Sequence, residues 1–425
     1  MRKKRKAVFV VAVAAALIAA AVLLLRSGNG ESLDKTVTFS DGTTMTLRAV
    51  TCGKEHRYLR GNLKERLIGL LPKKLRTKYA SRSVMLSSRG ALVFWLERRG
   101  SGPPNGDPQL VLCDSTGLGV SGFFSMMRLG PQGSSVEGWM YEYWPRRDRT
   151  FTLRIYEQGK RYPDATNVGE FTIRNPLFRK YPLWDAPPPP VTAREGDMIV
   201  TLVDLVSGVG RGANKWKPAR NPTVSTTRAG FRVERNGAPA AEWEIVTAEA
   251  SDATGNVIFD RRSTSFERGL AYAELQPHLW PAESGWKLRM GFSQQSNFVS
   301  SDLWTFRAPL DGSRVTNTIA FTNSEGVVLR YLGQGRQHSF KEDHHFNFRV
   351  IPESSDYRVT LVSAVDDLGK PARGEASFES PREWTFARDA STNATAIDLT
   401  VALHKTRYFD FLVRPQVVST NTQTK

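Results

Sequence analysis

Phe94-Trp95-Leu96-Glu97-Arg98-Arg99-Gly100 is the stretch that decides the fold, because the chain repeats it as Phe231-Arg232-Val233-Glu234-Arg235-Asn236-Gly237. A third, weaker copy is Phe348-Arg349-Val350, which Pro352 closes. Each copy has the residue pattern of a β-strand that runs into a turn. An internal repeat of this kind predicts that the chain consists of copies of one structural unit.

Four other kinds of segment accompany the repeated stretch, always in the same order. Each copy has an opening strand before it, and an apolar strand ending in Asp-x-x-Gly, an alternating strand and an aromatic strand running into proline after it. The Asp-x-x-Gly copies are residues 114–117, 252–255 and 366–369; the alternating strands are 151–155, 286–290 and 397–401; the aromatic strands are 171–176, 306–309 and 411–415. We expect each aromatic strand to close its own unit.

The expected fold class is all-β. Alternation with turn residues between the runs indicates antiparallel sheets, and units of about 100 residues with short strands are typical of immunoglobulin-like β-sandwiches. The predicted sandwiches are residues 36–176, 195–309 and 317–416, and residues 417–425 form a disordered tail. A proline-rich linker, residues 177–194, separates the first two sandwiches; Pro187–Pro190 make it stiff and extended.

Residues 1–26 are expected to form a membrane anchor. Ala7–Leu25 is an uninterrupted apolar run of nineteen residues, and five basic residues precede it. Such a helix spans roughly the 30 Å of a bilayer core, and the basic flank stays in the cytoplasm. The alternative is a cleaved signal peptide, for which alanines 14–16 and 19–21 offer cleavage sites, although Val22–Leu25 continue the apolar run beyond them. Either interpretation places the body in the periplasm or outside the cell.

The net charge of +17 is concentrated in two segments. The N-terminal flank contributes five positive charges, and residues 54–82 contribute a net eight, from ten Lys/Arg and two acids. The remaining units are therefore close to neutral. Together with the extracytoplasmic location, this argues against nucleic acid as a partner.

Residues 54–82 are predicted to be a helical insertion in the first sandwich. Its leucines follow helical spacing on both sides of Pro72. The opposite face carries the basic residues Lys64, Arg66, Lys73, Lys74, Arg76 and Lys78. Either the leucines cap an open end of the sandwich and the basic face is solvated, or the helices bind anionic lipid or an acidic envelope polymer.

Cys52 and Cys113 both belong to the first unit, at positions where the second unit has serines. Outside the cytoplasm a disulfide between them is chemically allowed. Two buried free thiols are the alternative.

Two possible metal sites are weak. His344 is the better ligand candidate in a His-rich segment, but His344 and His345 are neighbours and should point to opposite faces of a strand. One aspartate per Asp-x-x-Gly segment falls short of calcium coordination, so we interpret these segments as β-turns. No metal and no cofactor is expected.

Function is less constrained than fold. The sequence has no nucleophile elbow, zinc-protease helix or phosphate-binding glycine loop, and no catalytic residue can be named. We expect a non-enzymatic binding or structural module of the cell envelope with an unidentified protein partner. The alternatives are an envelope hydrolase with a site between units, and a glycan-binding protein using tryptophans such as Trp139, Trp144, Trp184 or Trp216. Alternation places Trp139, Tyr141 and Tyr143 on one face, towards the core.

The run Phe171-Thr172-Ile173-Arg174-Asn175-Pro176, the following Tyr181-Pro182-Leu183-Trp184 and the proline-rich spacer resemble segments of uncharacterised membrane-anchored bacterial proteins. The resemblance covers about a tenth of the chain. It implies an envelope location and no particular activity, ligand or catalytic residue.

Overall fold

The computed structural model describes residues 35–58, 84–100, 108–125, 134–157, 167–211, 216–218, 226–260, 265–267, 269–310, 319–335, 344–354, 356–372, 377–379 and 383–417. Apart from a short 3-10 turn, η2 (Ser300–Asp302), the regular secondary structure of these residues is β-strand, which confirms the all-β class. None of the described segments forms a helix that is long and apolar enough to cross a bilayer. The predicted anchor, Ala7–Leu25, lies outside the described residues.

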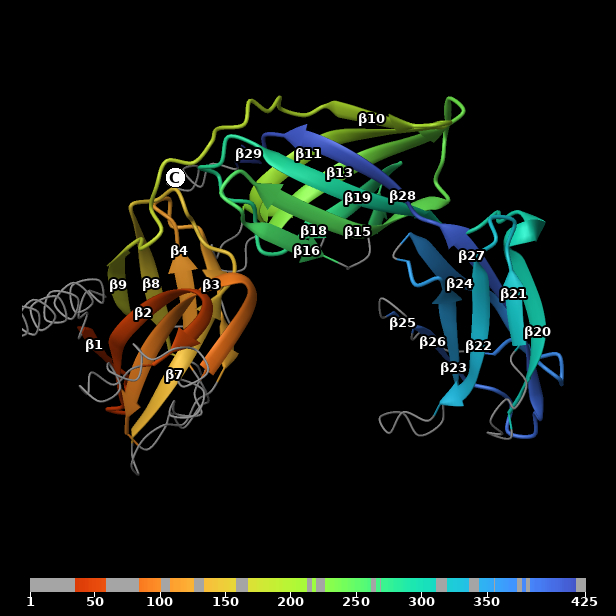
Figure 1. Ribbon diagram of the computed structural model, residues 1–425, viewed down its shortest axis with the longest axis horizontal. Helices are drawn as coiled ribbons and strands as arrows, with labels where there is room; N and C mark the ends of the chain where they lie inside the picture. Colours follow the sequence, from red (N-terminus) through yellow and green to blue (C-terminus); the bar gives the residue numbers. More distant parts are fainter. Residues whose placement is uncertain are drawn as a thin grey trace, which may run out of the picture.

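Unit one consists of two facing antiparallel sheets (Figure 1). The first sheet has the order β1 (Lys35–Thr38), β2 (Thr44–Arg57), β3 (Val84–Arg99), β7 (Ser134–Tyr141), β6 (Phe123–Ser125). The second has the order β5 (Gly119–Ser121), β4 (Gln109–Cys113), β8 (Thr150–Tyr156), β9 (Asn167–Arg174). Leu96, Leu112 and Leu153 are fully buried in its core, because alternation along each strand turns one row of apolar side chains inward.

Unit two repeats this arrangement. Its first sheet has the order β10 (Val191–Glu195), β11 (Met198–Arg211), β13 (Thr226–Arg235), β18 (Leu270–Leu275), β17 (Ser265–Glu267), with β12 (Trp216–Pro218) and β14 (Ala238–Pro239) at its margins. Its second sheet has the order β16 (Val257–Asp260), β15 (Trp243–Asp252), β19 (Trp286–Gln294), β28 (Arg407–Val413). The short β29 (Gln416–Val417) runs parallel to β11.

Unit three has the same strand order, except that its second sheet has three described strands instead of four. Its first sheet consists of β21 (Ile319–Thr322), β22 (Val328–Gly335), β23 (His344–Ile351), β26 (Glu383–Arg388) and β25 (Ser377–Glu379). Its second sheet consists of β24 (Tyr357–Asp366), β27 (Ala396–Lys405) and β20 (Leu303–Pro309). The leading hairpin of every unit also contains a register shift, at Leu47/Ala49, Leu202/Asp204 and Tyr331/Gly333. The same pattern of strand pairing thus recurs along the chain.

Units two and three exchange their closing strands. We expected residues 306–309 to close unit two and residues 411–415 to close unit three, and this pairing is wrong. β28, which contains Phe411, pairs with β19 of unit two. β20, which contains Phe306, pairs with β27 of unit three. The reason is the connection between β27 and β28, which is Thr406 alone. Hairpin loops have at least two residues, so β28 cannot turn back onto β27. In unit one, by contrast, ten residues join β8 to β9, and these strands do form a hairpin.

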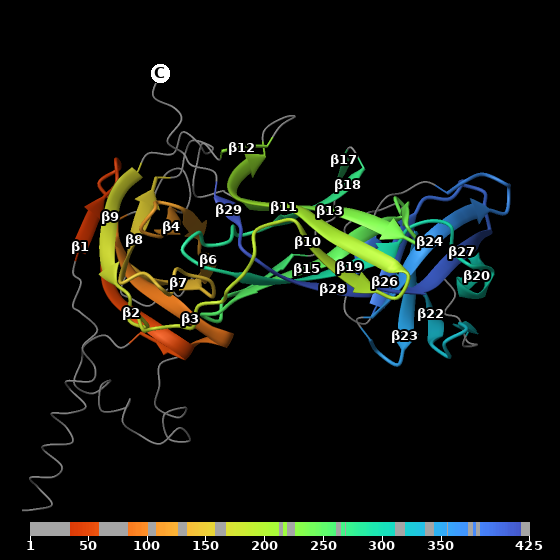
Figure 2. The same cartoon turned by 90° about the horizontal axis from the view of Figure 1, so that it is seen from above.

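The exchanged strands complete each other's cores. Phe409, Phe411 and Val413 of β28 are buried in unit two, where the Phe411 and Phe231 ring centroids are 5.7 Å apart. Ala308 of β20 is fully buried in unit three. Figures 1 and 2 show β28, near the end of the chain, lying among the strands of unit two. The predicted sandwiches 195–309 and 317–416 are thus each completed by a strand from the other.

The Asp-x-x-Gly segments are β-turns, as predicted. In the second copy, Asp252 Oδ1 accepts the backbone N–H groups of Thr254 (2.8 Å) and Asn256 (2.9 Å), and Gly255 has a φ of 92°. Asp114 and Asp366 cap their turns in the same way, with positive φ at Gly117 and Gly369. The carboxylate stabilises the turn, and glycine accepts the left-handed conformation without strain.

Candidate functional site

The predicted basic surface lies outside the described residues, as do all six of its members: Lys64, Arg66, Lys73, Lys74, Arg76 and Lys78. The structure corrects where the insertion begins. Residues 54–57 continue β2, and Arg57 pairs with Val84 at the start of β3. Immediately after β2, the Tyr58 ring packs against the Trp95 ring on the outer face of the first sheet, and the two ring centroids are 5.6 Å apart.

The disulfide between Cys52 and Cys113 is not formed; both thiols are free. Leu112 faces the core of unit one, so alternation turns Cys113 to the opposite, outer face of its sheet, where it is buried beside Val111. Cys113 therefore cannot reach across the sandwich to Cys52, which is exposed on β2. Burial raises the pKa of the Cys113 thiol to about 11. The structure thus has two free thiols, of which only Cys113 is buried, whereas the alternative had both of them buried.

The structure places most of the histidine and tryptophan candidates. His344 is half-buried with Nδ1 3.0 Å from Gln334 Nε2, and His345 is buried on the opposite face, as alternation predicts. No group of three or more potential metal ligands occurs among the described residues. Trp139 and Trp144 are buried, which removes them as glycan platforms. Trp184 is half-buried, and the Trp216 side chain is outside the description.

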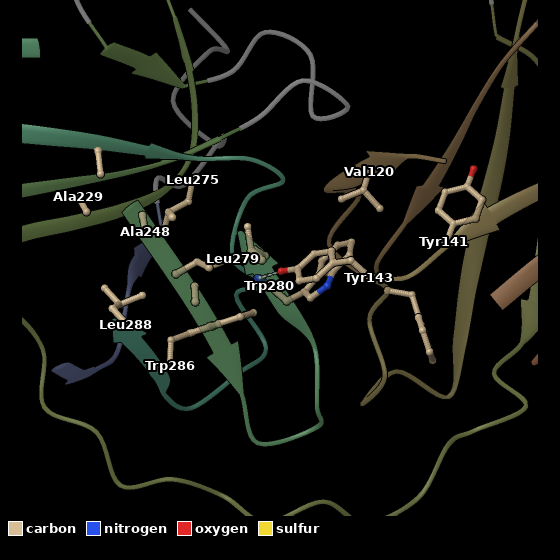
Figure 3. Close-up of a cluster of buried hydrophobic side chains, with 14 of the residues drawn as sticks. Val120, Tyr141, Tyr143, Ala229, Ala248, Leu275, Leu279, Trp280, Trp286 and Leu288 are labelled. Atoms are coloured by element: carbon tan, nitrogen blue, oxygen red, sulfur yellow. Dashed lines mark hydrogen bonds between the residues drawn. The ribbon is translucent and has the colours of Figure 1, made fainter. Parts of the chain in front are cut away.

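The structure instead concentrates buried polar groups where units one and two meet. Tyr143, two residues after the end of β7, stacks on Trp280 of unit two with ring centroids 5.2 Å apart and planes 10° apart (Figure 3). Its hydroxyl donates to the His278 carbonyl oxygen (2.7 Å) and accepts the Trp280 backbone N–H (3.2 Å). A buried tyrosine hydroxyl requires such partners, so the ring and the hydroxyl together fix how the two units dock.

A second contact at this junction uses the Asp252 turn of unit two. The Asn256 side chain donates to the Trp144 carbonyl oxygen (3.0 Å) and accepts the Trp144 N–H (3.3 Å), so it pairs with the backbone of unit one as a neighbouring strand would. Arg146 donates to the Thr254 carbonyl oxygen (3.0 Å), and its guanidinium group lies 3.8 Å from the Trp144 ring centroid. The turn is therefore both a local cap and a docking element.

A buried ion pair completes the junction. Arg147 Nε lies 2.7 Å from Glu283 Oε2, and the Glu283 side chain is 3% exposed. Burial raises the pKa of Glu283 to about 7, and the nearby Asp252 carboxylate adds to this effect, which Arg147 offsets only in part. The apolar side chains of both units belong to one continuous core. Units one and two are consequently docked as a packed interface.

The crossover between units two and three is centred on His404, at the end of β27. This buried imidazole bridges the units: Nδ1 is 3.0 Å from Ser293 Oγ in unit two, and Nε2 is 2.9 Å from Thr360 Oγ1 in unit three. Burial, and to a smaller extent Arg358, lowers its pKa to about 3. His404 is therefore neutral near pH 7, and each hydroxyl can complement one ring nitrogen.

The start of β28 is held by a shared carboxylate. Asp197, in the turn between β10 and β11, contacts Arg235 Nε (2.6 Å) and Arg407 Nη1 (2.5 Å). Hydrogen bonds from these two guanidinium groups hold the pKa of Asp197 well below its usual range. Arg407 opens β28, so this contact fastens the exchanged strand to unit two where it arrives.

Sequence reasoning missed these junction residues. Their partners are far away in the chain: Tyr143 and Trp280 are separated by 137 positions. The available signal was the density of aromatic and basic residues immediately after the predicted strand, Trp144-Pro145-Arg146-Arg147.

No protein-family model, no curated protein and no solved structure matches the chain. The resemblance to uncharacterised membrane-anchored bacterial proteins therefore stays a prediction.

Replacing Tyr143 with Phe should weaken the junction between units one and two. The ring stays, but the His278 carbonyl and the Trp280 N–H lose their buried partner, so the free energy of unfolding should fall by about 1–3 kcal/mol. Amide hydrogen exchange should become faster across residues 278–284. Tyr141→Phe is the control, since Tyr141 bonds only within unit one, to the Leu110 carbonyl (3.0 Å). Unchanged amide exchange at residues 278–284 in Tyr143→Phe would contradict the claim that the Tyr143 hydroxyl holds units one and two together.

His404 should make the crossover sensitive to acid. Its folded pKa of about 3 lies below the ordinary 6.5, so between these values only the unfolded chain takes up a proton. The stability that neutral His404 contributes is therefore complete above pH 6.5 and is lost as the pH falls towards 3, by at most about 1.4 kcal/mol per pH unit. Urea midpoints measured from pH 8 to pH 4 should fall less steeply in His404→Gln than in the wild type. His344→Gln should keep the wild-type slope, and an equally steep slope in His404→Gln would refute this assignment.

Proposed function

We propose that the protein is a non-enzymatic scaffold of a bacterial cell envelope. In this proposal Ala7–Leu25 spans the inner membrane once, the N-terminus is cytoplasmic, and three immunoglobulin-like units extend outside the cytoplasm. The observation that carries the proposal is the way the units are joined. A continuous core connects units one and two, and exchanged strands connect units two and three.

Such joints suit a protein that holds surfaces at a fixed separation. Domains linked by flexible segments and small polar interfaces move relative to one another by default. Here, relative movement of units one and two would break the Tyr143–Trp280 stack and the buried Arg147–Glu283 pair. Movement of unit three against unit two would disturb His404 and pull on β28. The units are therefore built to keep their relative position.

The ionisable groups at the joints support a structural role. Glu283 is paired with Arg147, Asp197 with two arginines, and His404 with two hydroxyls. An envelope hydrolase with its site between units is less well supported, because the first junction is filled by buried Tyr143, Trp280 and Trp286. The unidentified protein partner remains part of the proposal. Binding of anionic lipid or an acidic envelope polymer to residues 54–82 also remains part of the proposal. Nucleic acid is not a proposed partner.

The chain carries its own reporter for the proposed location, because Cys52 is exposed and Cys113 is buried. In spheroplasts of an expressing bacterium, a membrane-impermeant maleimide carrying a mass tag should add one tag without lysis. The tag should disappear in Cys52→Ser and persist in Cys113→Ser. Labelling of Cys52 only after lysis would place the body in the cytoplasm and overturn the proposal. Release of the labelled body from washed membranes would show that residues 1–26 are a cleaved leader and not an anchor.

A further inference from the structure

We infer that the segment from Leu177 to Trp184, together with Arg149, is a membrane-docking loop that rests on an anionic phospholipid surface. The inference depends on the proposed membrane tether for its location. It concerns residues other than 54–82, and every residue in it belongs to the described part of the chain.

The loop exposes apolar side chains in a cluster. Leu177, Phe178 and Leu183 are 37%, 45% and 74% exposed, and Leu183 is the most exposed large apolar side chain of the described residues. Three of the nine exposed large apolar side chains thus fall within seven consecutive residues. Single exposed leucines are normal on a protein surface, whereas a contiguous group indicates an interaction site.

Cations lie among these apolar side chains. The Arg149 guanidinium is 5.5 Å from the Phe178 ring centroid, and the Arg179 guanidinium is 4.8 Å from the Tyr181 ring centroid. Arg149, Arg179 and Lys180 are all exposed, and Asp185 is the acid that follows in the sequence. The loop therefore presents positive charge and apolar surface together.

The backbone holds the loop in this shape. Asn175 Oδ1 accepts the Leu177 N–H (3.0 Å), and the Tyr181 hydroxyl donates to the Leu177 carbonyl (3.1 Å). At the other end Arg147 Nη2 donates to the Pro182 carbonyl (2.7 Å), and the Trp184 N–H donates to Ser284 Oγ in unit two (3.1 Å). Because both ends are tied down, the exposed side chains are presented outward in a fixed arrangement, which lowers the entropy lost on docking.

A lipid surface fits this chemistry better than a glycan. Sugars stack on open aromatic faces, but the rings of Phe178 and Tyr181 each already carry a guanidinium group. Leu183 offers an aliphatic side chain, which gains most from acyl chains. Leucine and aromatic residues flanked by Lys and Arg are the composition of membrane-interface anchors, in which cations meet phosphates while apolar groups enter the boundary region.

The path of the chain into unit one agrees with docking on this side. β1 runs from Lys35 towards Ser40, whose N–H donates to Glu157 (3.1 Å) just past the end of β8. That end is opposite the one from which the loop departs, because β9 runs antiparallel to β8 and ends at Arg174. β1 therefore runs away from the end of unit one from which the loop departs, and Lys35 is the end of β1 that lies nearer to the loop.

The test uses the full chain with both native cysteines replaced by serine and one new cysteine carrying the polarity-sensitive fluorophore NBD. Leu183→Cys places the probe on the loop, and Leu368→Cys, at a 53% exposed position in the third-unit turn, is the matched control. The protein is mixed with phosphatidylcholine vesicles with or without phosphatidylglycerol. Flotation of the protein with the vesicles reports the tether, and the probe reports the loop.

With phosphatidylglycerol, the fluorescence emission of the probe at position 183 should shift to the blue. Nitroxide-labelled lipid should quench this probe, and iodide should not. The probe at position 368 should still be quenched by iodide. Arg149→Gln, Arg179→Gln and Lys180→Gln combined should expose the probe at 183 as fully as the control, with flotation and the urea midpoint unchanged.

Flotation with equal iodide access at 183 and 368 would overturn the loop inference and leave the tether intact. Flotation only with phosphatidylglycerol, with the probe at 183 protected, would support the loop and contradict the tether. Absence of flotation from both lipids would contradict both. Protection of the probe by a soluble acidic polysaccharide, and not by phosphatidylglycerol vesicles, would replace lipid by a glycan and overturn the inference.

Discussion

A single residue, Thr406, separates β27 from β28, and the architecture of the last two units depends on this constraint. Because the connection is too short for a hairpin, the chain continues out of unit three and into unit two. β28 then occupies the place beside β19, and β20 fills the vacant place beside β27. The eight residues between β19 and β20 are long enough to permit this crossing. Thr406 itself is buried, and its N–H donates to the Asp356 carbonyl oxygen (2.6 Å).

The exchange changes what a unit is in this protein. Three copies of one topology are present, but only unit one is closed by its own strand. Units two and three are interdependent, since Phe411 stabilises a core that forms mostly from residues more than a hundred positions earlier. Unit one joins this pair by packing, through Tyr143, Asn256 and the Arg147–Glu283 pair. Strand exchange and a merged core thus connect the three units in two different ways.

Sequence patterns predicted the local structure well and the long-range pairing poorly. Asp-x-x-Gly turns and strand alternation follow from local chemistry, so the turns at Asp114, Asp252 and Asp366 were correct. The strand exchange was not predicted because the aromatic strands at 306–309 and 411–415 have equivalent sequence patterns. The signal for it was His404-Lys405-Thr406-Arg407, which contains no turn residue and so does not favour a hairpin. The sequence left open whether Cys52 and Cys113 pair, because four consecutive apolar residues, Leu110 to Cys113, give no alternation that would reveal which face Cys113 takes. The junction residues depend on partners that only the folded chain brings near.

The most direct test of the strand exchange is a pair of engineered crosslinks in a chain with Cys52 and Cys113 replaced by serine. Arg289 and Asp410 are exposed and directly opposite each other on β19 and β28. Without exchange, the repeat would instead place Thr305 opposite Arg289, since Phe306 and Phe411 are equivalent. Under mild oxidation, peptide mapping of Arg289→Cys/Asp410→Cys should show the crosslinked pair, and Arg289→Cys/Thr305→Cys should stay reduced. A crosslink between positions 289 and 305, with none between 289 and 410, would contradict the account.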